Sequence, residues 1–242
     1  KVGPRFIPKI LGNTAAANIA IDYNIQGPSF TVSTACSSGG DAINTACMCM
    51  QSGKADIMLA VGAESVLCPL VIYSLANAKA LSRRNDSPST ASRPFDVTRD
   101  GFVIGEGGGA LVLETEESAN GRNARKYAEI KGYAQAHRPV SYDNSEVDSK
   151  AVVEVIEKAC VNAGIEADNI DFVCCDDRKI IKTLMPCYDV SQEIGNARAA
   201  ASAMTAAYAA ELLSDSEKNY EYGLALSMGA GGTYSAVILK KA

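Results

Sequence analysis

The sequence contains no tryptophan and a single histidine, His137. One imidazole excludes a metal site built from several histidines of this chain, and it leaves one such residue for acid–base catalysis near neutral pH. Basic residues are too few for a nucleic-acid-binding face, since 23 Lys and Arg stand against 28 Asp and Glu. We therefore expect any chemistry to depend on a thiol or on backbone dipoles.

Long apolar runs are also absent. No hydrophobic stretch reaches the length that crosses a bilayer, and the first residues do not resemble a signal peptide. The eight cysteines lie in helix-like and strand-like segments, not in the loop framework of a small disulfide-stabilised protein, and they lack metal-ligand spacing. These features predict a cytoplasmic protein with reduced thiols and no metal site.

Helix-like and strand-like segments alternate along the 242 residues. Apolar residues at helical spacing predict helices over residues 13–22, 149–163 and 197–213, with another running from Cys36 to about Gly53. Short apolar or β-branched runs predict strands over residues 29–33, 56–62, 110–114, 125–133, 171–175, 222–226 and 234–239. Such an alternation is typical of a mostly parallel sheet with helices on its faces, arranged as two related α/β halves.

The junction at Cys36 is the sharpest local feature. A short strand, a tight turn and a helix beginning at the cysteine would place Sγ at the helix N-terminus. There the helix dipole and the N–H groups favour the nucleophilic thiolate. Small neighbours such as Ala35 and Gly39 would admit a substrate carbonyl, and the Cys36 N–H would serve as an oxyanion donor. The alternative is a structural cysteine at the start of a helix.

Five motifs surround this junction in the first half of the chain. They are Gly27-Pro28-Ser29, Thr34-Ala35-Cys36-Ser37-Ser38-Gly39, Ser92-Arg93-Pro94-Phe95-Asp96, Arg99-Asp100-Gly101-Phe102 and Gly105-Glu106-Gly107. Together they resemble the β-ketoacyl-ACP synthase family, which has the thiolase fold and condenses acyl chains. The resemblance implies that Cys36 is acylated from an acyl carrier protein, whose phosphopantetheine arm delivers the substrates without a further cofactor. It also implies that the Arg-Asp-Gly and Gly-Glu-Gly turns hold the active-site floor.

The resemblance further implies a layered α/β/α thiolase fold of two related halves, residues 1–135 and 136–242. The first half would be incomplete, because family members carry further strands and helices before the Gly-Pro-Ser stretch. Open sheet edges must be covered. We therefore expect a homodimer, or a heterodimer with another synthase chain.

In the second half the resemblance is weaker, and the differences fall on the family's catalytic positions. Asp176 stands in the slot of the first family histidine, and Asn196 stands in the slot of the second. Ser191 and Thr205 occupy the positions of a family lysine and a family glutamate. Asn196 still offers a hydrogen-bond donor, whereas an ionised Asp176 would repel an enolate.

Ala230 occupies the position of a gating Phe in the family's Gly-rich loop, here residues 227–233. Its backbone N–H would be the second oxyanion donor, because that role needs only an amide. His137 lies in a polar stretch, residues 137–144, that is predicted to connect the two halves. It is outside both histidine slots, and we interpret it as a solvated loop residue.

Acyl transfer onto Cys36 needs a nucleophile and an oxyanion hole, whereas decarboxylative condensation also needs two neutral imidazoles beside the enolate oxygen. We therefore expect an acyltransferase of the β-ketoacyl-ACP synthase type, in fatty-acid or polyketide biosynthesis, that condenses poorly. One alternative is a non-elongating synthase that only moves acyl chains. Another is a non-catalytic partner subunit comparable to a chain-length factor. The retained Cys36 favours an enzyme, and the altered second half favours the partner.

Overall fold

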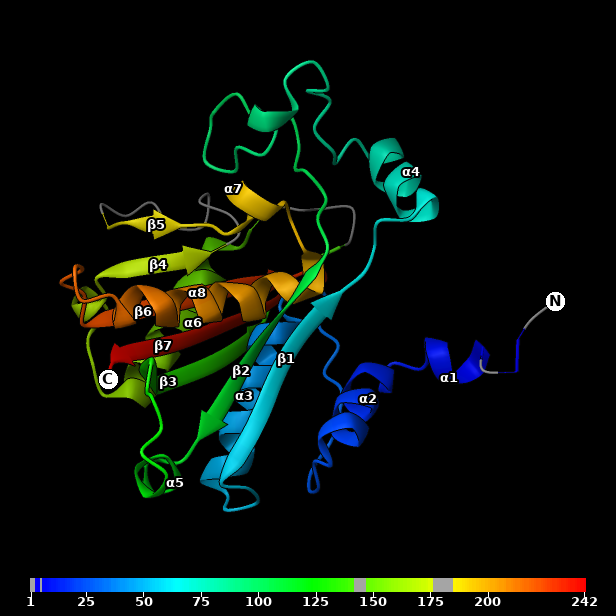
Figure 1. The fold of residues 1–242 in the computed structure, drawn as a ribbon. Coiled ribbons are helices and arrows are strands. Elements are labelled where there is room, and N and C mark those ends of the chain that lie inside the picture. Colours follow the sequence, from blue (N-terminus) through cyan, green and yellow to red (C-terminus); the bar gives the residue numbers. More distant parts are fainter. Residues whose placement is uncertain (1–2, 5, 142–146, 176–184) are drawn as a thin grey trace.

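The computed structural model describes residues 3–4, 6–141, 147–175 and 185–242 (Figure 1). Its helices are α1 (Phe6–Ile10), α2 (Thr14–Tyr23), α3 (Ser38–Gln51), α4 (Pro69–Asn77), α5 (Glu116–Gly121), α6 (Ser149–Ala163), α7 (Ser191–Ile194) and α8 (Ala201–Ser214). Its strands are β1 (Ile57–Glu64), β2 (Gly107–Glu114), β3 (Ala128–His137), β4 (Phe172–Cys175), β5 (Cys187–Tyr188), β6 (Tyr222–Gly229) and β7 (Thr233–Lys241).

The described strands form two sheets. Strands β1 and β2 make a two-stranded antiparallel sheet, and the other five lie in the order β3-β7-β6-β4-β5. Within the larger sheet, β4 is parallel to β5 and β6, but β7 is antiparallel to both β3 and β6. The prediction of a mostly parallel sheet is therefore wrong. The short turn between Gly229 and Thr233 forces β6 and β7 to be antiparallel, because a parallel crossover needs a much longer connection.

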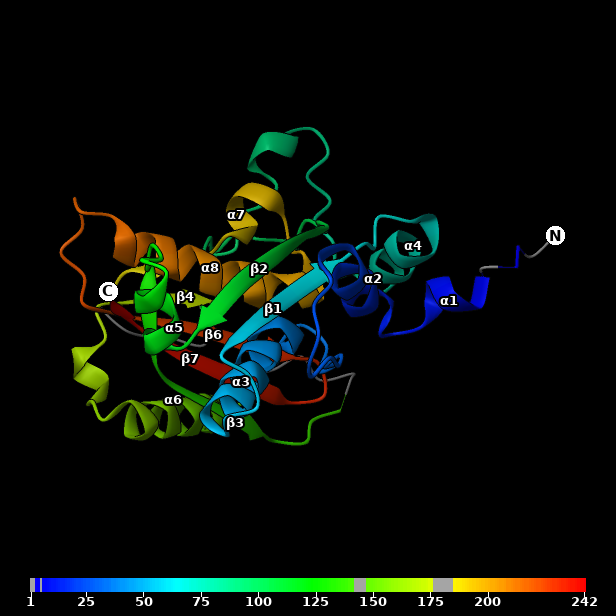
Figure 2. The same cartoon turned by 60° about the horizontal axis from the view of Figure 1, so that its bottom comes forward.

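Helices separate and cover the two sheets. One face of the five-stranded sheet packs against α6 through side chains such as Val155 and Ile238. The other face packs against α3 and α8, which also contact β1 and β2 through residues such as Ala60 and Leu113. Figures 1 and 2 show α3 and α8 lying between the two sheets. The layered α/β arrangement predicted from the sequence is confirmed.

Local signals explain several element boundaries. Helix α6 has the predicted bounds because the Asp148 side chain accepts a hydrogen bond from Lys150 N, at 2.9 Å, and Gly164 takes a left-handed φ of 69° after the last turn. Helix α8 begins at Ala201 and not at residue 197. The reason is that Arg198 has a φ of 53° and opens a short 3₁₀ turn ahead of the helix.

Two further expectations are corrected. Residues 29–33 form no strand, because no strand of the described chain lies beside them to supply backbone hydrogen bonds; all but the half-buried Val32 are exposed. His137 is not in a loop: it is the last residue of β3 and pairs with Thr233 of β7, with its Nδ1 3.2 Å from Thr233 Oγ1. The expected boundary between residues 135 and 136 thus falls within β3.

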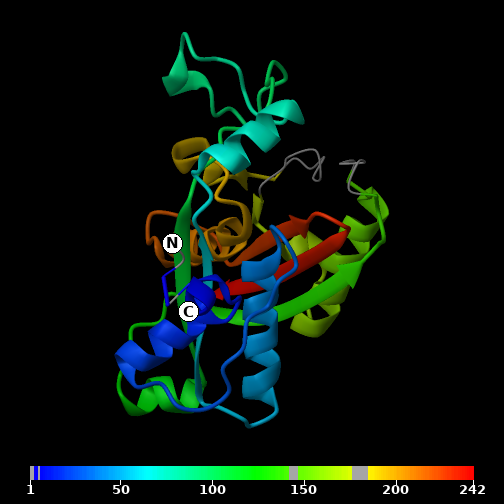
Figure 3. The same ribbon diagram turned by 90° about the vertical axis from the view of Figure 1, so that its right-hand side faces the viewer.

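Three helices extend away from the sheets. Helices α1, α2 and α4 contain no buried residue. Figure 1 shows them on the right-hand side of the molecule, which is the side that faces the viewer in Figure 3. Large apolar side chains on and near them are exposed, namely Phe6, Ile7, Ile10, Leu11, Ile21, Tyr23, Leu67, Leu70 and Tyr73. Among the residues that the structure describes, no helix combines the length and apolar character needed to span a membrane.

Candidate functional site

Cys36 lies in a tight turn directly before α3 and is partly exposed. Ala35 has a φ of 59°, in the left-handed region that costs an ordinary residue about 1–2 kcal/mol. The turn is closed by Ser38 N, which donates to Ala35 O at 3.0 Å. The helix begins at Ser38 and not at the cysteine, because its first helical hydrogen bond is the one that Asp41 N donates to Ser37 O, at 2.9 Å. Cys36 lies two residues before the first residue of the helix.

A buried carboxylate anchors this turn from within α3. Asp41 is 2% exposed, and its Oδ2 accepts hydrogen bonds from Thr34 Oγ1, at 2.5 Å, and from Ser37 Oγ, at 3.2 Å. Ser37 Oγ also lies 2.8 Å from Thr34 O, to which it can donate. Such contacts hold Ala35 in its unfavourable conformation. Sequence reasoning missed Asp41, because an acidic residue is favoured in the first turn of a helix whether it is buried or exposed.

Glycines in the first turn of α3 permit close packing. A Cβ on Gly39 would lie 2.6 Å from Ala203 N, and one on Gly40 would lie 2.8 Å from Ser235 Oγ. Gly40 N also donates to Ser202 Oγ at 3.1 Å. The sequence interpretation assigned these small residues to substrate access. The structure shows that they let α3 approach α8 and β7, which fixes the Cys36 turn against the second half.

The β6–β7 turn lies against the Cys36 turn. A Cβ on Gly229 would lie only 2.0 Å from Thr34 O, so that position accepts no side chain. The turn is closed by Gly232 N, which donates to Gly229 O at 3.1 Å. Ala230 is exposed at its tip, and its N–H donates to no described residue. The structure thus brings Ala230 beside the cysteine turn, although it lies 194 residues after Cys36 in the sequence.

Asn196 lies shortly before the N-terminal end of α8, the end that packs against the first turn of α3. Its backbone bridges to Ile104, and its Oδ1 accepts a hydrogen bond from Arg198 N at 2.9 Å. Within the described residues Nδ2 has no hydrogen bond, so the amide retains a donor. Ser191 and Thr205 are buried, and Ser191 N donates to Asp189 Oδ1 at 2.8 Å.

Asp176, predicted in the slot of the first family histidine, lies outside the described residues.

The acidic motifs of the first half act as hydrogen-bond acceptors in turns. Asp100 accepts from Arg83 N and Ser82 Oγ and pairs with Arg93, and these bonds, with Arg83 N first, lower its carboxyl pKa to about 2. Glu106 accepts from Leu67 N at 3.2 Å. Each therefore fixes the conformation of a loop; that these turns hold the floor of an active site is still a prediction.

Two of the other thiols, those of Cys47 and Cys174, are buried. Burial raises the pKa of Cys47 to about 12, and burial also raises the pKa of Cys174. A thiol that stays protonated is a poor nucleophile. Burial therefore makes these two cysteines unsuited to acyl transfer.

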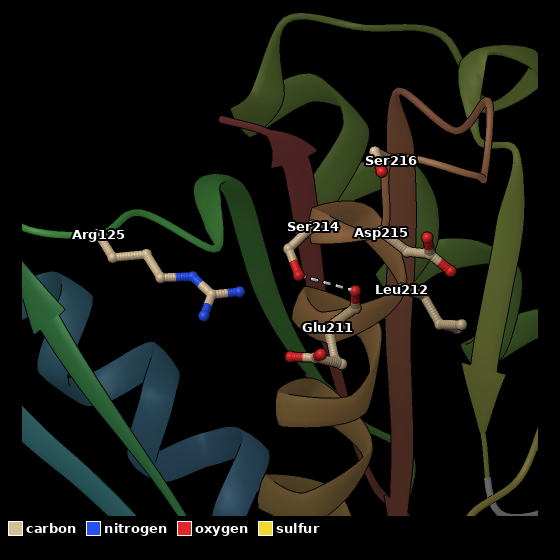
Figure 4. A pocket seen from close by; sticks show the side chains of 6 residues that line it. All are labelled: Arg125, Glu211, Leu212, Ser214, Asp215 and Ser216. Carbon is tan, nitrogen blue, oxygen red and sulfur yellow. Dashed lines mark hydrogen bonds between the residues drawn. The ribbon is translucent and has the colours of Figure 1, made fainter.

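A shallow cavity of about 300 Å³ lies at the far end of α8, away from Cys36 (Figure 4). Arg125 points toward Glu211 across it, and the Arg125 guanidinium also stacks 4.3 Å from the centre of the Tyr127 ring. None of the predicted site residues lines this cavity. In the described part of the chain, no group of three His, Cys, Asp or Glu side chains is arranged to hold a metal ion.

Comparison with known proteins places this geometry in a family. Residues 1–119 match the family model of the β-ketoacyl synthase N-terminal domain. The chain belongs to the β-ketoacyl synthase family. Its fold is the thiolase fold: it superposes with a TM-score of 0.91, over its full length and 70% of the other chain, on a type II polyketide ketosynthase in complex with its acyl-carrier protein. The two sequences are 27% identical.

Curated relatives are β-ketoacyl synthases, named 3-oxoacyl-[acyl-carrier-protein] synthase 2. The Rhizobium meliloti protein is 40% identical over 174 residues, which is 72% of this chain and 41% of that protein. The Vibrio cholerae protein is 36% identical over 238 residues, which is 98% of this chain and 55% of that protein. The chain thus spans about half the length of the curated relatives it matches.

Proposed function

We propose that this β-ketoacyl synthase family member is an acyltransferase that takes an acyl group from acyl carrier protein onto Cys36. One observation carries the proposal. The turn that holds Cys36 contains a left-handed Ala35, is anchored by hydrogen bonds to Asp41, and packs against the turn that contains Ala230. Such a conformation costs free energy and is found mainly at functional sites, which favours a reacting group in this turn.

The proposed transfer uses the thiol and two backbone amides. The Cys36 thiolate attacks the thioester carbonyl, and the negative charge that develops on the oxygen is stabilised by the Cys36 and Ala230 N–H groups. The tetrahedral intermediate then collapses, and the phosphopantetheine thiolate of the carrier protein leaves. The products are acyl-Cys36 and a free carrier thiol.

Condensation is the step that the altered second half impairs. The Nδ2 of Asn196 can donate one hydrogen bond to an enolate oxygen, since only its Oδ1 is engaged by Arg198. Asp176 supplies no such donor when ionised. Loss of one preorganised donor typically costs about 10²–10³ in rate. We therefore propose transfer without efficient decarboxylation, in fatty-acid or polyketide biosynthesis, and this includes a non-elongating synthase.

A second candidate function is a chain-length-factor-like partner subunit, and it is favoured by Asn196 and Ser191 at positions where the resemblance expects a histidine and a lysine. Helices α1, α2 and α4 bury no residue, and apolar side chains such as Phe6 and Leu70 are 48% and 79% exposed. Exposed apolar surface of this extent marks an interaction site. The same surfaces would serve an active synthase as a homodimer or heterodimer interface, so they argue for assembly under either function.

Intact-mass spectrometry after incubation with acyl-carrier protein tests the proposal. An acyl adduct is expected on the wild-type chain and on Cys68→Ala, which removes an exposed thiol, and none on Cys36→Ala. No adduct on the wild-type chain, together with co-purification of a second synthase, would instead support the partner-subunit function. An adduct on Cys36→Ala would contradict the assignment of the nucleophile.

A further inference from the structure

Two cysteines of the five-stranded sheet lie in direct contact, away from the Cys36 turn. Cys175 ends β4 and Cys187 begins β5, and their Sγ atoms are 3.4 Å apart. This distance is too long for a disulfide, whose S–S bond is about 2.05 Å, and short enough for a small shift to close it. The contact is therefore that of a thiol pair.

The pairing of the strands explains why these two thiols meet. Strands β4 and β5 are parallel, with Val173 opposite Cys187 and Cys174 opposite Tyr188. Because successive side chains alternate between faces, Cys175 shares a face with Val173 and therefore with Cys187. Cys174 points to the other face, where it joins the cluster of side chains between the sheet and α8.

The two thiols differ in access. Cys175 is fully buried. Cys187 is partly exposed and lies on the edge strand of the sheet. An oxidant can therefore reach Cys187 first, and Cys175 is in place to react with it next.

We propose that Cys175 and Cys187 are a disulfide-forming pair, oxidised by a low-molecular-weight disulfide such as oxidised glutathione. Nothing in this proposal depends on acyl transfer at Cys36. The pair is a covalent modification site built by the sheet itself.

The reaction is a two-step thiol–disulfide exchange. The Cys187 thiolate attacks one sulfur of oxidised glutathione, the S–S bond of glutathione breaks, and one glutathione leaves as a thiolate that takes up a proton. Cys175 then loses its proton and attacks Cys187 Sγ, and the second glutathione leaves. Two protein thiols lose two electrons to form the disulfide, and oxidised glutathione is reduced to two glutathione thiols.

The new bond would tie down the shortest strand of the described sheet, which lies at its edge. Strand β5 has two residues and pairs only with β4 in the described chain. The chain after β5 leads through Asp189 and Ser191, which are joined by a 2.8 Å hydrogen bond, to Asn196. A covalent link at Cys187 would restrict this segment and raise the thermal unfolding midpoint of the oxidised protein.

Peptide mapping of the full chain treated with oxidised glutathione tests the proposal. Arg178, Lys179 and Lys182 separate the two cysteines, so trypsin releases them on different peptides unless a disulfide joins them. The expected product is a Cys175–Cys187 linked pair in the wild-type chain, with a higher unfolding midpoint than the reduced chain. Cys187→Ser should form no link, and the matched control Cys174→Ser should retain it.

Three results would overturn the proposal. One is a glutathione adduct that persists on Cys187 of the folded wild-type chain. Another is a link from Cys187 to Cys174 in place of Cys175. The third is recovery of both cysteines as free thiols after treatment that oxidises the exposed Cys68. Because all three are read from wild-type protein, they hold even if a serine variant folds poorly.

Discussion

Two units of the molecule share one plan and differ in what surrounds them. In each, a helix is followed by a strand that pairs antiparallel with a later strand: α3, β1 and β2 in the first unit, and α8, β6 and β7 in the second. Strands β6 and β7 are buried along most of their length, whereas β1 and β2 are exposed at alternate residues. The second unit has β3 and β4 as neighbouring strands, and the described chain supplies none for the first.

The predicted nucleophile lies in the unit with less packing around it. The less covered first unit holds Cys36 and the carboxylate of Asp41 that anchors its turn. The well-packed second unit contributes Ala230 and Asn196, which the family resemblance places at the positions of a Phe and a histidine. On this prediction, the second half keeps the packing of the fold without the expected side chains, and the first half keeps the proposed nucleophile, Cys36.

The largest expected effect is a difference in how much a substitution in each sheet lowers the free energy of unfolding. Phe172 of β4 is fully buried and stacks near Tyr188 and Tyr220, so Phe172→Ala should lower the free energy of unfolding by about 3–5 kcal/mol. Val112 of β2 is 64% exposed, and Val112→Ala should change it by less than about 0.5 kcal/mol. Chemical denaturation of both variants checks this contrast. Equal losses would show that β2 is covered in solution.

The next effect tests the contact between the two units. Gly229→Ala would place a Cβ 2.0 Å from Thr34 O, so we expect a loss of about 1–3 kcal/mol in stability. Acylation of Cys36 should also slow by about 10²–10³, as for loss of an oxyanion donor. In the matched control Gly108→Ala, the nearest atom to the new Cβ is Gly62 O at 3.4 Å. An unchanged rate of Cys36 acylation in a folded Gly229→Ala protein would contradict the proposed role of the Ala230 N–H as an oxyanion donor.

A smaller effect is expected at the anchor of the cysteine turn. Asp41→Asn keeps one oxygen to accept from Thr34 or Ser37 but loses the charge that strengthens both bonds, so unfolding should become easier by about 1–2 kcal/mol. Acylation should slow while the apparent affinity for the acyl donor stays constant, because Asp41 positions the turn and touches no substrate. Calorimetry and acylation kinetics on the same sample measure both. A change in donor affinity alone would contradict this positioning role.

The smallest effect concerns the exposed edge of the first unit. The Arg122 side chain, followed by Ser118, lowers the pKa of Glu114 from 4.5 to about 2. A carboxyl whose folded pKa is lowered stabilises the fold above its unfolded pKa, and this contribution is lost as the pH falls from about 4.5 toward 2. The difference in urea midpoint between the wild type and Glu114→Gln should therefore shrink over that window. A constant difference would show that the pair with Arg122 does not form in solution.

Much of the fold could be predicted from periodicity and capping signals. Helix α6 has its predicted bounds because Asp148 and Gly164 mark its ends, and β1, β4, β6 and β7 lie within a few residues of their expected positions. Pairing partners could not be predicted in this way. Residues 29–33 have β-branched character, but none of the strands that the structure describes lies beside them, and β5 is too short to give a signal.

The candidate site shows the same division. The motif at Cys36 pointed to the nucleophile, and the family resemblance pointed to Ala230, while the contact between Gly229 and Thr34 depends on tertiary packing alone. Asp41 was missed because a buried acid in a helix has the same sequence pattern as an exposed one. The roles of Cys36, Ala230 and Asn196 are still predictions.

The central claim is that Cys36 accepts an acyl chain but that condensation is impaired. The most direct measurement follows acyl-Cys36 and carbon dioxide together in one reaction with acyl- and malonyl-carrier protein. We predict that acyl-Cys36 accumulates while carbon dioxide release is at least about 10²-fold slower than acylation. Carbon dioxide release that keeps pace with acylation, with β-ketoacyl product formed by this chain alone, would contradict the account.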